Sequence, residues 1–227
     1  MRKIVTLFAA LLLTTLAFAS KPLPDRYSPY QYGHRWYFSL QGGPALLSTE
    51  HIDSYFKNGR GWEAISWQGA LSFGYYFSDA WDLRISGSYT YSADACSPYK
   101  GFYPYHFHAA HLFADMMLNL TALAEYNTPF NPKLYLGVGG AYTFGATKVN
   151  HLYEVPDFPN LTPAFRLGSV FEFNARSGWG WFLDLGAEAF TDWYNGLEPD
   201  GFPLDLQFNV SFGLVYHFGN AKTVSKY

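Results

Sequence analysis

The charged residues of this chain recur at alternate positions, a spacing that could build a buried ionic network. Asp82 and Arg84 are separated by one residue, so both occupy even-numbered positions of one segment. Arg166 and Glu172 also share such a parity, meaning that both positions are even-numbered or both odd-numbered. Along an extended strand, positions of one parity point to one face. Buried charges require partners, so carboxylates and guanidinium groups on one face are expected to pair. The candidate network comprises Arg84, Asp115, Arg166, Glu172, Asp184, Glu188 and Asp205.

The histidines could support two other kinds of chemistry. His106, His108 and His111 have a spacing that could bind a metal. On a strand, however, His108 and His111 face opposite ways, so we expect interfacial histidines and no metal site. A lipid-modifying enzyme would need a histidine beside a serine, with an acid to orient the histidine. The run 51–54, His-Ile-Asp-Ser, falls in a predicted loop. The acids near the rim lack a convincing base, so no enzymatic activity is predicted.

An unusually aromatic segment lies in a predicted loop. It contains Tyr99, Phe102, Tyr103 and Tyr105. Exposed rings would suit stacking on sugars or contact with a protein partner. The alternative is that these rings fold over the mouth of the structure or join an interfacial band.

Long alternating segments must position these groups. From Leu204 to Phe218, apolar residues occupy one parity and mostly polar residues the other. This is longer than an ordinary strand and matches the roughly 9–11 residues that cross a bilayer. Seven earlier segments share the pattern. The predicted strands are 36–43, 65–77, 81–92, 107–126, 133–144, 162–174, 179–190 and 203–218.

The connections between these segments alternate between long and short. Within each segment, the charged residues do not occupy the alternate positions that hold the apolar residues. Both features are typical of an all-β, eight-stranded, antiparallel up-and-down transmembrane β-barrel with long extracellular loops. Aromatic residues cluster near the strand ends, where a barrel places its interfacial girdles. A soluble barrel or sandwich with an aromatic core is the alternative, but its strands would be shorter.

The composition agrees with such a barrel. Of 227 residues, 21% are aromatic and 15% are charged, against roughly 25% charged in ordinary soluble proteins. The mean hydropathy of −0.09 is too low for a bundle of membrane helices. A net charge of −3 gives no reason to expect nucleic acid. Cys96 is the only cysteine, so no intrachain disulfide can form, and no motif indicates a cofactor.

The chain begins like an exported protein. A basic start, an apolar run from Ile4 to Leu16 and the small-x-small residues 17–19 predict a cleaved signal peptide over 1–19. We expect an extended segment over 20–35, the barrel over 36–218 and a short periplasmic tail over 219–227.

Four motifs resemble the barrel domain of OmpA-like outer-membrane proteins, particularly those of Bacteroidetes. They are Asp115–Thr121, Leu136–Ala141, Asp192–Gly196 and Gly213–Gly219. The resemblance implies location in the outer membrane, contact with its lipid and lipopolysaccharide, and insertion by the outer-membrane assembly machinery, which reads a terminal strand ending in an aromatic residue such as Phe218. We expect no periplasmic peptidoglycan-binding domain, and therefore no tethering to the cell wall.

We predict a structural or surface-interaction role, with the lumen closed by an ion-paired plug because eight strands leave room for side chains alone. A narrow pore for small solutes is the first alternative, and a lipid-modifying barrel enzyme is the second. No loop motif identifies an extracellular partner.

Overall fold

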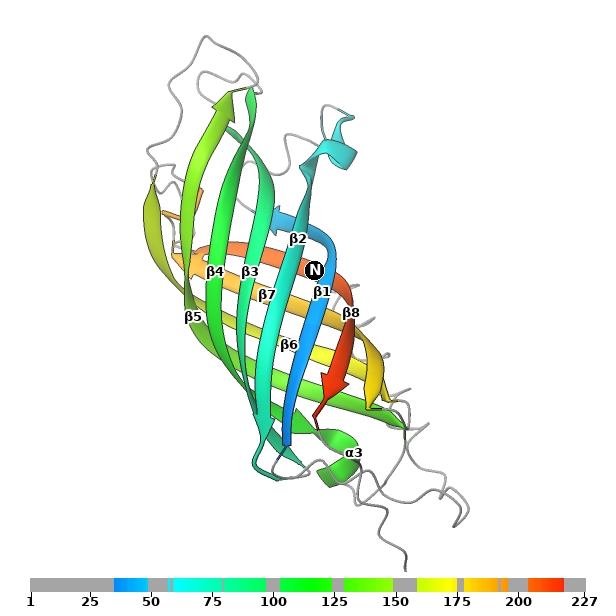
Figure 1. Cartoon of the computed structure of the whole chain (residues 1–227). Coiled ribbons are helices and arrows are strands. Elements are labelled where there is room, and N and C mark those ends of the chain that lie inside the picture. The colour runs from blue at the N-terminus through cyan, green and yellow to red at the C-terminus, as the bar shows by residue number, and fades with distance from the viewer. Residues whose placement is uncertain are drawn as a thin grey trace, which may run out of the picture.

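Eight antiparallel strands close into one barrel, in which each strand pairs with its sequence neighbours and β8 pairs with β1 (Figure 1). The computed structural model describes residues 35–48, 57, 59–78, 80–96, 103–123, 129–148, 159–174, 178–191, 193–195 and 204–218. The strands are β1 (Arg35–Ser48), β2 (Ile65–Tyr76), β3 (Trp81–Cys96), β4 (Tyr103–Asn119), β5 (Phe130–Lys148), β6 (Asn160–Asn174), β7 (Trp179–Thr191) and β8 (Leu204–His217). The predicted fold class is confirmed. The predicted signal peptide and tail lie outside the described residues.

The two ends of the barrel carry different short helices. The 3-10 helix η1 (Gly61–Ala64) precedes β2 at one end, and the helix α3 (Leu120–Leu123) follows β4 at the other. We call these the η1 end and the α3 end; they are the top and the bottom of Figure 1. At the η1 end β3, β4 and β5 extend beyond the neighbouring strands. β3 pairs with β4 as far as Cys96 but with β2 only as far as Tyr91. β5 pairs with β4 as far as Lys148 but with β6 only as far as Thr143.

Several strand ends differ from the sequence-based prediction: β1 continues to Ser48 instead of ending at 43, and β5 spans Phe130–Lys148 instead of 133–144. β3 and β4 continue pairing to Cys96 and Tyr103, so the predicted long loop is reduced to six residues, 97–102. β4 ends at Asn119 and does not continue to 126. The Asn119 side chain causes this early end, since its Oδ1 accepts a hydrogen bond from the backbone N–H of Thr121 at 3.1 Å. An asparagine in this role caps a helix start, and α3 follows.

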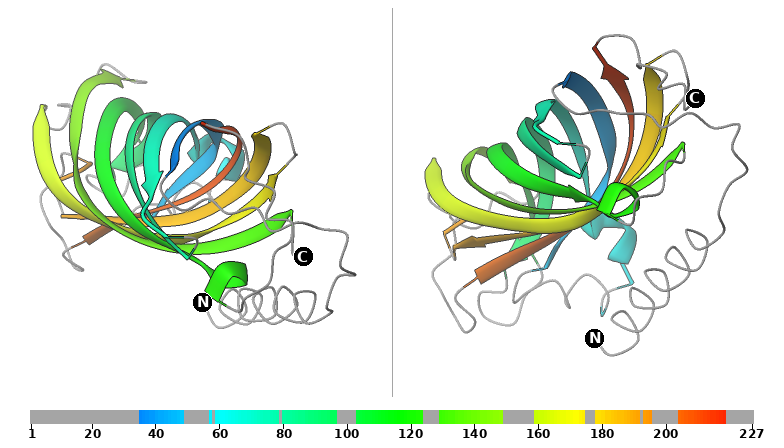
Figure 2. Two further views of the ribbon diagram at one scale, coloured as in Figure 1. Left: turned by 60° about the horizontal axis from the view of Figure 1, so that its bottom comes forward. Right: turned by 90° about the horizontal axis from the view of Figure 1, so that it is seen from below.

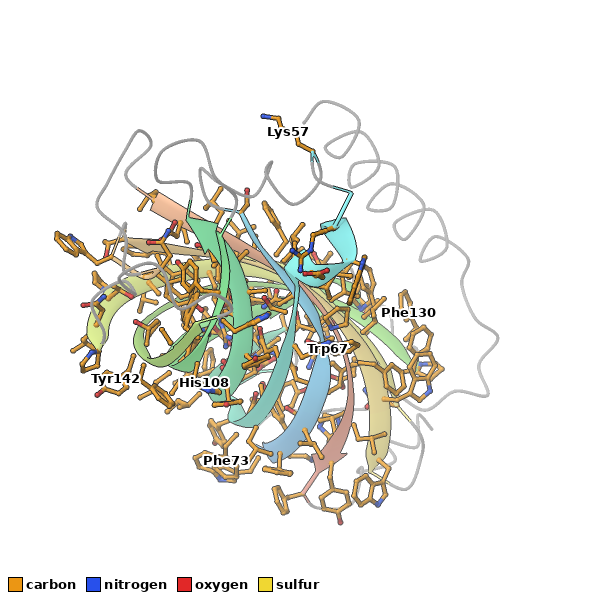
Figure 3. All side chains as sticks on the ribbon, turned by 90° about the horizontal axis from the view of Figure 1, so that it is seen from above. Lys57, Trp67, Phe73, His108, Phe130 and Tyr142 are labelled. Carbon is orange, nitrogen blue, oxygen red and sulfur yellow. The ribbon has the colours of Figure 1, made fainter. Side chains whose placement is uncertain are left out.

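The barrel is apolar outside and mostly polar inside, where two groups of buried apolar side chains also lie. The strands curve around a single interior (Figure 2), and side chains of one parity on every strand point into it and are buried. The other parity is exposed and apolar: Phe73, Phe130 and Tyr142 project away from the barrel (Figure 3). A structure with its large apolar side chains outside is arranged opposite to a soluble domain, whose apolar side chains are mostly buried.

Rings gather on the outer surface near both ends. At the η1 end Trp67, Tyr91, His108 and Phe144 are neighbours in register across β2 to β5. At the α3 end the exposed or half-exposed rings include Trp36, Phe38, Phe73, Tyr75, Phe77, Trp81, Phe130, Phe171, Phe173, Trp179, Trp181, Tyr216 and Phe218. Aliphatic side chains, such as Leu136, fill the band between them. In the described part of the chain, no helix has the length and apolar character needed to cross a membrane.

Candidate functional site

The centre of the barrel interior holds an ionic group that we call the arginine cluster: Arg84, Asp115, Arg166 and Asp184. Asp115, on β4, is fully buried and accepts hydrogen bonds from both guanidinium groups. Arg166 Nε donates to its Oδ1 at 2.6 Å, and Arg84 Nε donates to its Oδ2 at 2.7 Å. One carboxylate thus holds two arginines, one from β3 and one from β6.

Asp184 completes this cluster from β7. Its Oδ2 lies 3.3 Å from Arg84 Nη1, and its Oδ1 accepts a hydrogen bond from the Tyr135 hydroxyl at 2.9 Å. The Tyr135 ring also lies under the Arg84 guanidinium, 4.7 Å from ring centroid to Cζ. Phe113 lies 4.3 Å from Cζ of Arg166 in the same way. Both guanidinium groups therefore have carboxylate and aromatic partners, which offset the cost of burying a charge.

A second group, the α3-end cluster, consists of Tyr37, Tyr76, Asp82, Lys133, Glu172 and His217. Lys133 Nζ lies 2.8 Å from Glu172 Oε2 and 3.7 Å from Asp82 Oδ2, and it also donates to the Tyr76 hydroxyl. His217 Nε2 lies 3.0 Å from Glu172 Oε1. A cavity of about 10 Å³ lies beside Lys133 and Glu172, which is about the room needed for one water molecule.

A third group, the η1-end cluster, comprises His111, Glu188, Tyr194, Gln207, Asn209 and Gln68. His111 Nδ1 lies 3.2 Å from Glu188 Oε2, and its Nε2 lies 3.0 Å from the Tyr194 hydroxyl. Asn209 Nδ2 donates to Glu188 Oε1 at 3.2 Å. Glu188 also lies 3.7 Å from Arg166 Nη1, so this group is continuous with the arginine cluster.

Tyr194 reaches the interior from the connection between β7 and β8. It is fully buried, and its ring stacks on Phe190 at a centroid distance of 3.9 Å. Burial raises the pKa of the Tyr194 phenol well above its usual range, so the phenol stays neutral. The ring belongs to a buried group that we call the mouth cluster: Leu47, Tyr105, Phe107, Ala109, Phe113, Ala141, Ala164, Phe190 and Tyr194.

The structure places all seven predicted network residues inside the barrel. Four of them form the arginine cluster, Glu188 contacts it, and Glu172 lies in the α3-end cluster. Asp205 lies apart, near the mouth, where its Oδ2 accepts a hydrogen bond from the backbone N–H of Asn195 at 3.3 Å. The prediction omitted Lys133, although its parity within β5 is the signal that could have identified it.

Tyr105 requires a correction to the predicted surface-contact group. Its side chain is 4% exposed and points into the mouth, where the hydroxyl donates to the Asn195 carbonyl at 2.8 Å and lies 3.1 Å from Asp94 Oδ2. Tyr105 therefore follows the alternative interpretation, in which the rings fold over the mouth. Tyr99 and Phe102 lie outside the described residues, as does the side chain of Tyr103.

The three clustered histidines are divided between the two faces of β4. His111 is buried inside, whereas His106 and His108 are on the outer surface. His108 Nδ1 lies 2.5 Å from the Tyr89 hydroxyl, and the His106 ring stacks on Tyr91. Within the described ranges, no group of three histidine, cysteine or acidic side chains is arranged to hold a metal ion.

Gly137 provides the space that the arginine cluster occupies. A Cβ at this position would overlap Asp115 Oδ1 and lie 3.0 Å from Cγ of Arg166. We therefore expect Gly137→Ala to lower the free energy of unfolding by about 1–3 kcal/mol. Urea unfolding of the refolded protein, followed by tryptophan fluorescence, measures this change.

Gly87→Ala is the matched control, because a Cβ there meets no atom within 4 Å. Alanine should leave stability unchanged or raise it by about 0.5–1 kcal/mol, since glycine is unfavourable within a strand. Equal urea midpoints for the two variants would contradict the close packing at Gly137.

Comparisons with known proteins identify the fold. No protein family matches the sequence, and no curated protein matches it. The crystal structure of Neisserial surface protein A matches with a TM-score of 0.50 and 11% sequence identity, covering 81% of this chain and 97% of that one. A major outer membrane protein from Thermus thermophilus matches with a TM-score of 0.49 and 12% identity, covering 82% and 100%. The likeness to the neisserial protein shows that this chain has the closed eight-stranded fold of outer-membrane barrels.

Proposed function

We propose that this protein spans an outer membrane and serves there as a closed barrel with a structural or surface-interaction role. The apolar outer face supports the membrane location. Soluble monomers rarely expose contiguous apolar patches above roughly 600 Å², whereas here every one of the eight strands carries exposed large apolar side chains on its outer face. Rings near both ends and aliphatic residues between them match the girdles and the apolar band of a membrane barrel.

In this orientation the η1 end faces the outside and the α3 end faces the periplasm. Short turns are expected on the periplasmic side, and the β2–β3 and β6–β7 connections at the α3 end have four residues each, 77–80 and 175–178. The outer surface would contact membrane lipid and lipopolysaccharide. The terminal strand and Phe218 would be read by the outer-membrane assembly machinery, after export on the predicted signal peptide.

The observation that best supports a closed barrel is that side chains fill its lumen. The three polar clusters follow one another along the lumen: Glu188 lies beside Arg166, and Arg84 lines the same small cavity as Lys133 and Glu172. The mouth cluster closes the η1 end, and a second buried group closes the other: Tyr37, Tyr76, Met117, Tyr135, Val170, Phe182 and Val215. Breaking a buried ion pair costs several kcal/mol, so spontaneous opening would be rare.

A structural role also accounts for the interior histidines. His111 and His217 are 3% and 2% exposed, respectively, and each contacts a glutamate. A general base must reach its substrate, and lipid cannot reach these imidazoles through the wall. The interior groups therefore support stabilisation of the barrel rather than catalysis.

Planar-bilayer recording tests the closed lumen. The purified, refolded protein should give no discrete channels at voltages at which a control porin, inserted under the same conditions, conducts. Gel migration without boiling should verify that the inserted protein is folded. Reproducible channels of appreciable conductance from the folded form would overturn the closed state and favour the narrow pore.

A further inference from the structure

A shallow recess lies on the outer face of β3, β4 and β5, towards the η1 end. Its floor is the exposed Ala110 on β4, whose neighbours in register are Tyr89 on β3 and Tyr142 on β5. The two tyrosines are 48% and 46% exposed, and Tyr142 projects away from the barrel (Figure 3). Neighbouring strands lie about 4.8 Å apart, so the strands that carry the two phenol rings are about 10 Å apart, with only a methyl group between the rings.

Glycines extend this recess towards the middle of the barrel. Gly87 on β3 and Gly140 on β5 flank Leu112, the next outward residue of β4. Gly87 is exposed, and a Cβ at this position would meet no atom within 4 Å. Below the glycines, Ile85 and Val138 are 53% and 56% exposed on the same two strands. Open apolar surface therefore continues from the recess along both sides of Leu112.

Polar groups line the other end of the recess. His108 is the next outward residue of β4 on the η1 side, and its Nδ1 lies 2.5 Å from the Tyr89 hydroxyl. A phenol that donates to Nδ1 leaves the proton of a neutral imidazole on Nε2, which can then donate to an outside acceptor. Among the described residues, none forms a hydrogen bond with Nε2 of His108. The rings of Tyr91 and Phe144 pack beside the imidazole, at centroid distances of 5.3 and 5.6 Å.

The order of these groups along the wall matches the order of groups in a membrane lipid. The glycines and aliphatic side chains lie where acyl chains would pack, and the phenols and the imidazole lie where a headgroup would begin. A phosphorylated sugar uses all of the polar end, since its C–H face packs on aromatic rings and its phosphate oxygens accept hydrogen bonds. None of the recess residues is acidic, so nothing in the recess repels a phosphate. In an outer leaflet, lipid A, the anchor of lipopolysaccharide, carries such a headgroup.

We propose that this recess binds one molecule of lipid A. An acyl chain runs past Gly87 to Ala110, the sugar packs against Tyr89 and Tyr142, and a phosphate accepts a hydrogen bond from His108. The inference rests on the proposed function, because it requires the η1 end to face the outer leaflet. The rest of the apolar outer surface contacts lipid without selecting it, whereas the recess holds lipid A in preference to a glycerophospholipid.

Native mass spectrometry of the full refolded chain in detergent tests the binding. Purified bis-phosphorylated lipid A or phosphatidylethanolamine is added, and gel migration without boiling verifies that the barrel is folded. We expect one lipid A molecule to be retained per barrel and phosphatidylethanolamine to bind about tenfold more weakly or worse. No retained lipid A, or equal retention of the two lipids, would overturn the proposal.

The variants Ala110→Leu and Ala187→Leu locate the binding. Ala187 also lies on the outer face, on β7, but its neighbours in register are Leu167 and Phe208 in place of tyrosines. Leucine at 110 fills the recess and should weaken lipid A binding by about tenfold or more, whereas leucine at 187 should leave it unchanged. Equal binding by the two folded variants would overturn the recess as the site.

The variant His108→Phe tests the phosphate contact. Phenylalanine keeps a ring between Tyr91 and Phe144 but removes the hydrogen-bond donor. Binding of bis-phosphorylated lipid A should weaken by about tenfold, whereas binding of dephosphorylated lipid A should not change. Equal effects on the two lipids would contradict the role of His108. These measurements are made in detergent, so their failure is distinguishable from failure of the membrane location, which cell fractionation tests.

Discussion

Replacing Asp115 with leucine will lower the free energy of unfolding by about 3–5 kcal/mol, which is the usual cost of removing one partner of a buried ion pair. Asp115 is the carboxylate that both Arg84 and Arg166 contact. Leucine keeps the branching of the side chain but not its charge, so two buried guanidinium groups would face each other without their shared counter-charge. Asp184 and Glu188 would each still pair with one arginine, which limits the loss of stability.

Urea unfolding of the barrel in detergent or lipid measures this loss. Asp115→Asn should fall between the wild type and Asp115→Leu, because the amide keeps one acceptor but loses the charge. The partly exposed ion pair of Arg60 and Glu63 provides the control: Glu63→Gln should change stability by about 0–1 kcal/mol. If Asp115→Leu were as mild as Glu63→Gln, the arginine cluster would not hold the barrel together.

Replacing Leu136 with arginine should lower stability in a lipid bilayer by about 2–4 kcal/mol, which is the cost of a cation at mid-depth on the outer face of a barrel. Leu136 is 64% exposed and lies between the two bands of rings, paired with Met116 and Leu167. In water, an exposed arginine would cost almost nothing. The substitution therefore distinguishes lipid from water around β5.

Leu161→Arg is the matched control for this prediction. Leu161 is 80% exposed, but it lies in register with Tyr142 near the η1 end. Near the interface, an outward arginine costs only about 0–1 kcal/mol. Both variants are refolded into lipid vesicles and unfolded in urea. A penalty that is small and equal at the two positions would mean that the surface near Leu136 is not surrounded by lipid.

Side-chain parity made the fold predictable from the sequence. Successive side chains of a strand point to opposite faces. Once the apolar positions were assigned to the outer face, Asp82, Arg84 and Asp115 could therefore be assigned to the inner face. The same parity placed His111 and His108 on opposite faces of β4, as the structure has them. Adjacent strands also brought Arg166 near Glu188, with which it pairs in register.

The detailed pairing inside the lumen was beyond such reasoning. Parity states which side chains point inward but not which of them meet across the barrel, so the pairing of Arg84 with Asp184 could not be derived. Tyr194 comes from an irregular connection without any period, and its contact with His111 gave no signal in the sequence. The end of β4 was missed because 120–123, Leu-Thr-Ala-Leu, continues the apolar alternation although it forms a helix.

We propose that this chain is a folded barrel embedded in an outer membrane, and cell fractionation tests both its location and its folded state. The protein is produced in a Gram-negative host, the membranes are separated, and samples are run on a gel with and without boiling. We expect recovery with the outer membrane and a shift in migration on boiling, because a closed barrel resists detergent until heated. A chain that is fully soluble after lysis and shows no shift would contradict it.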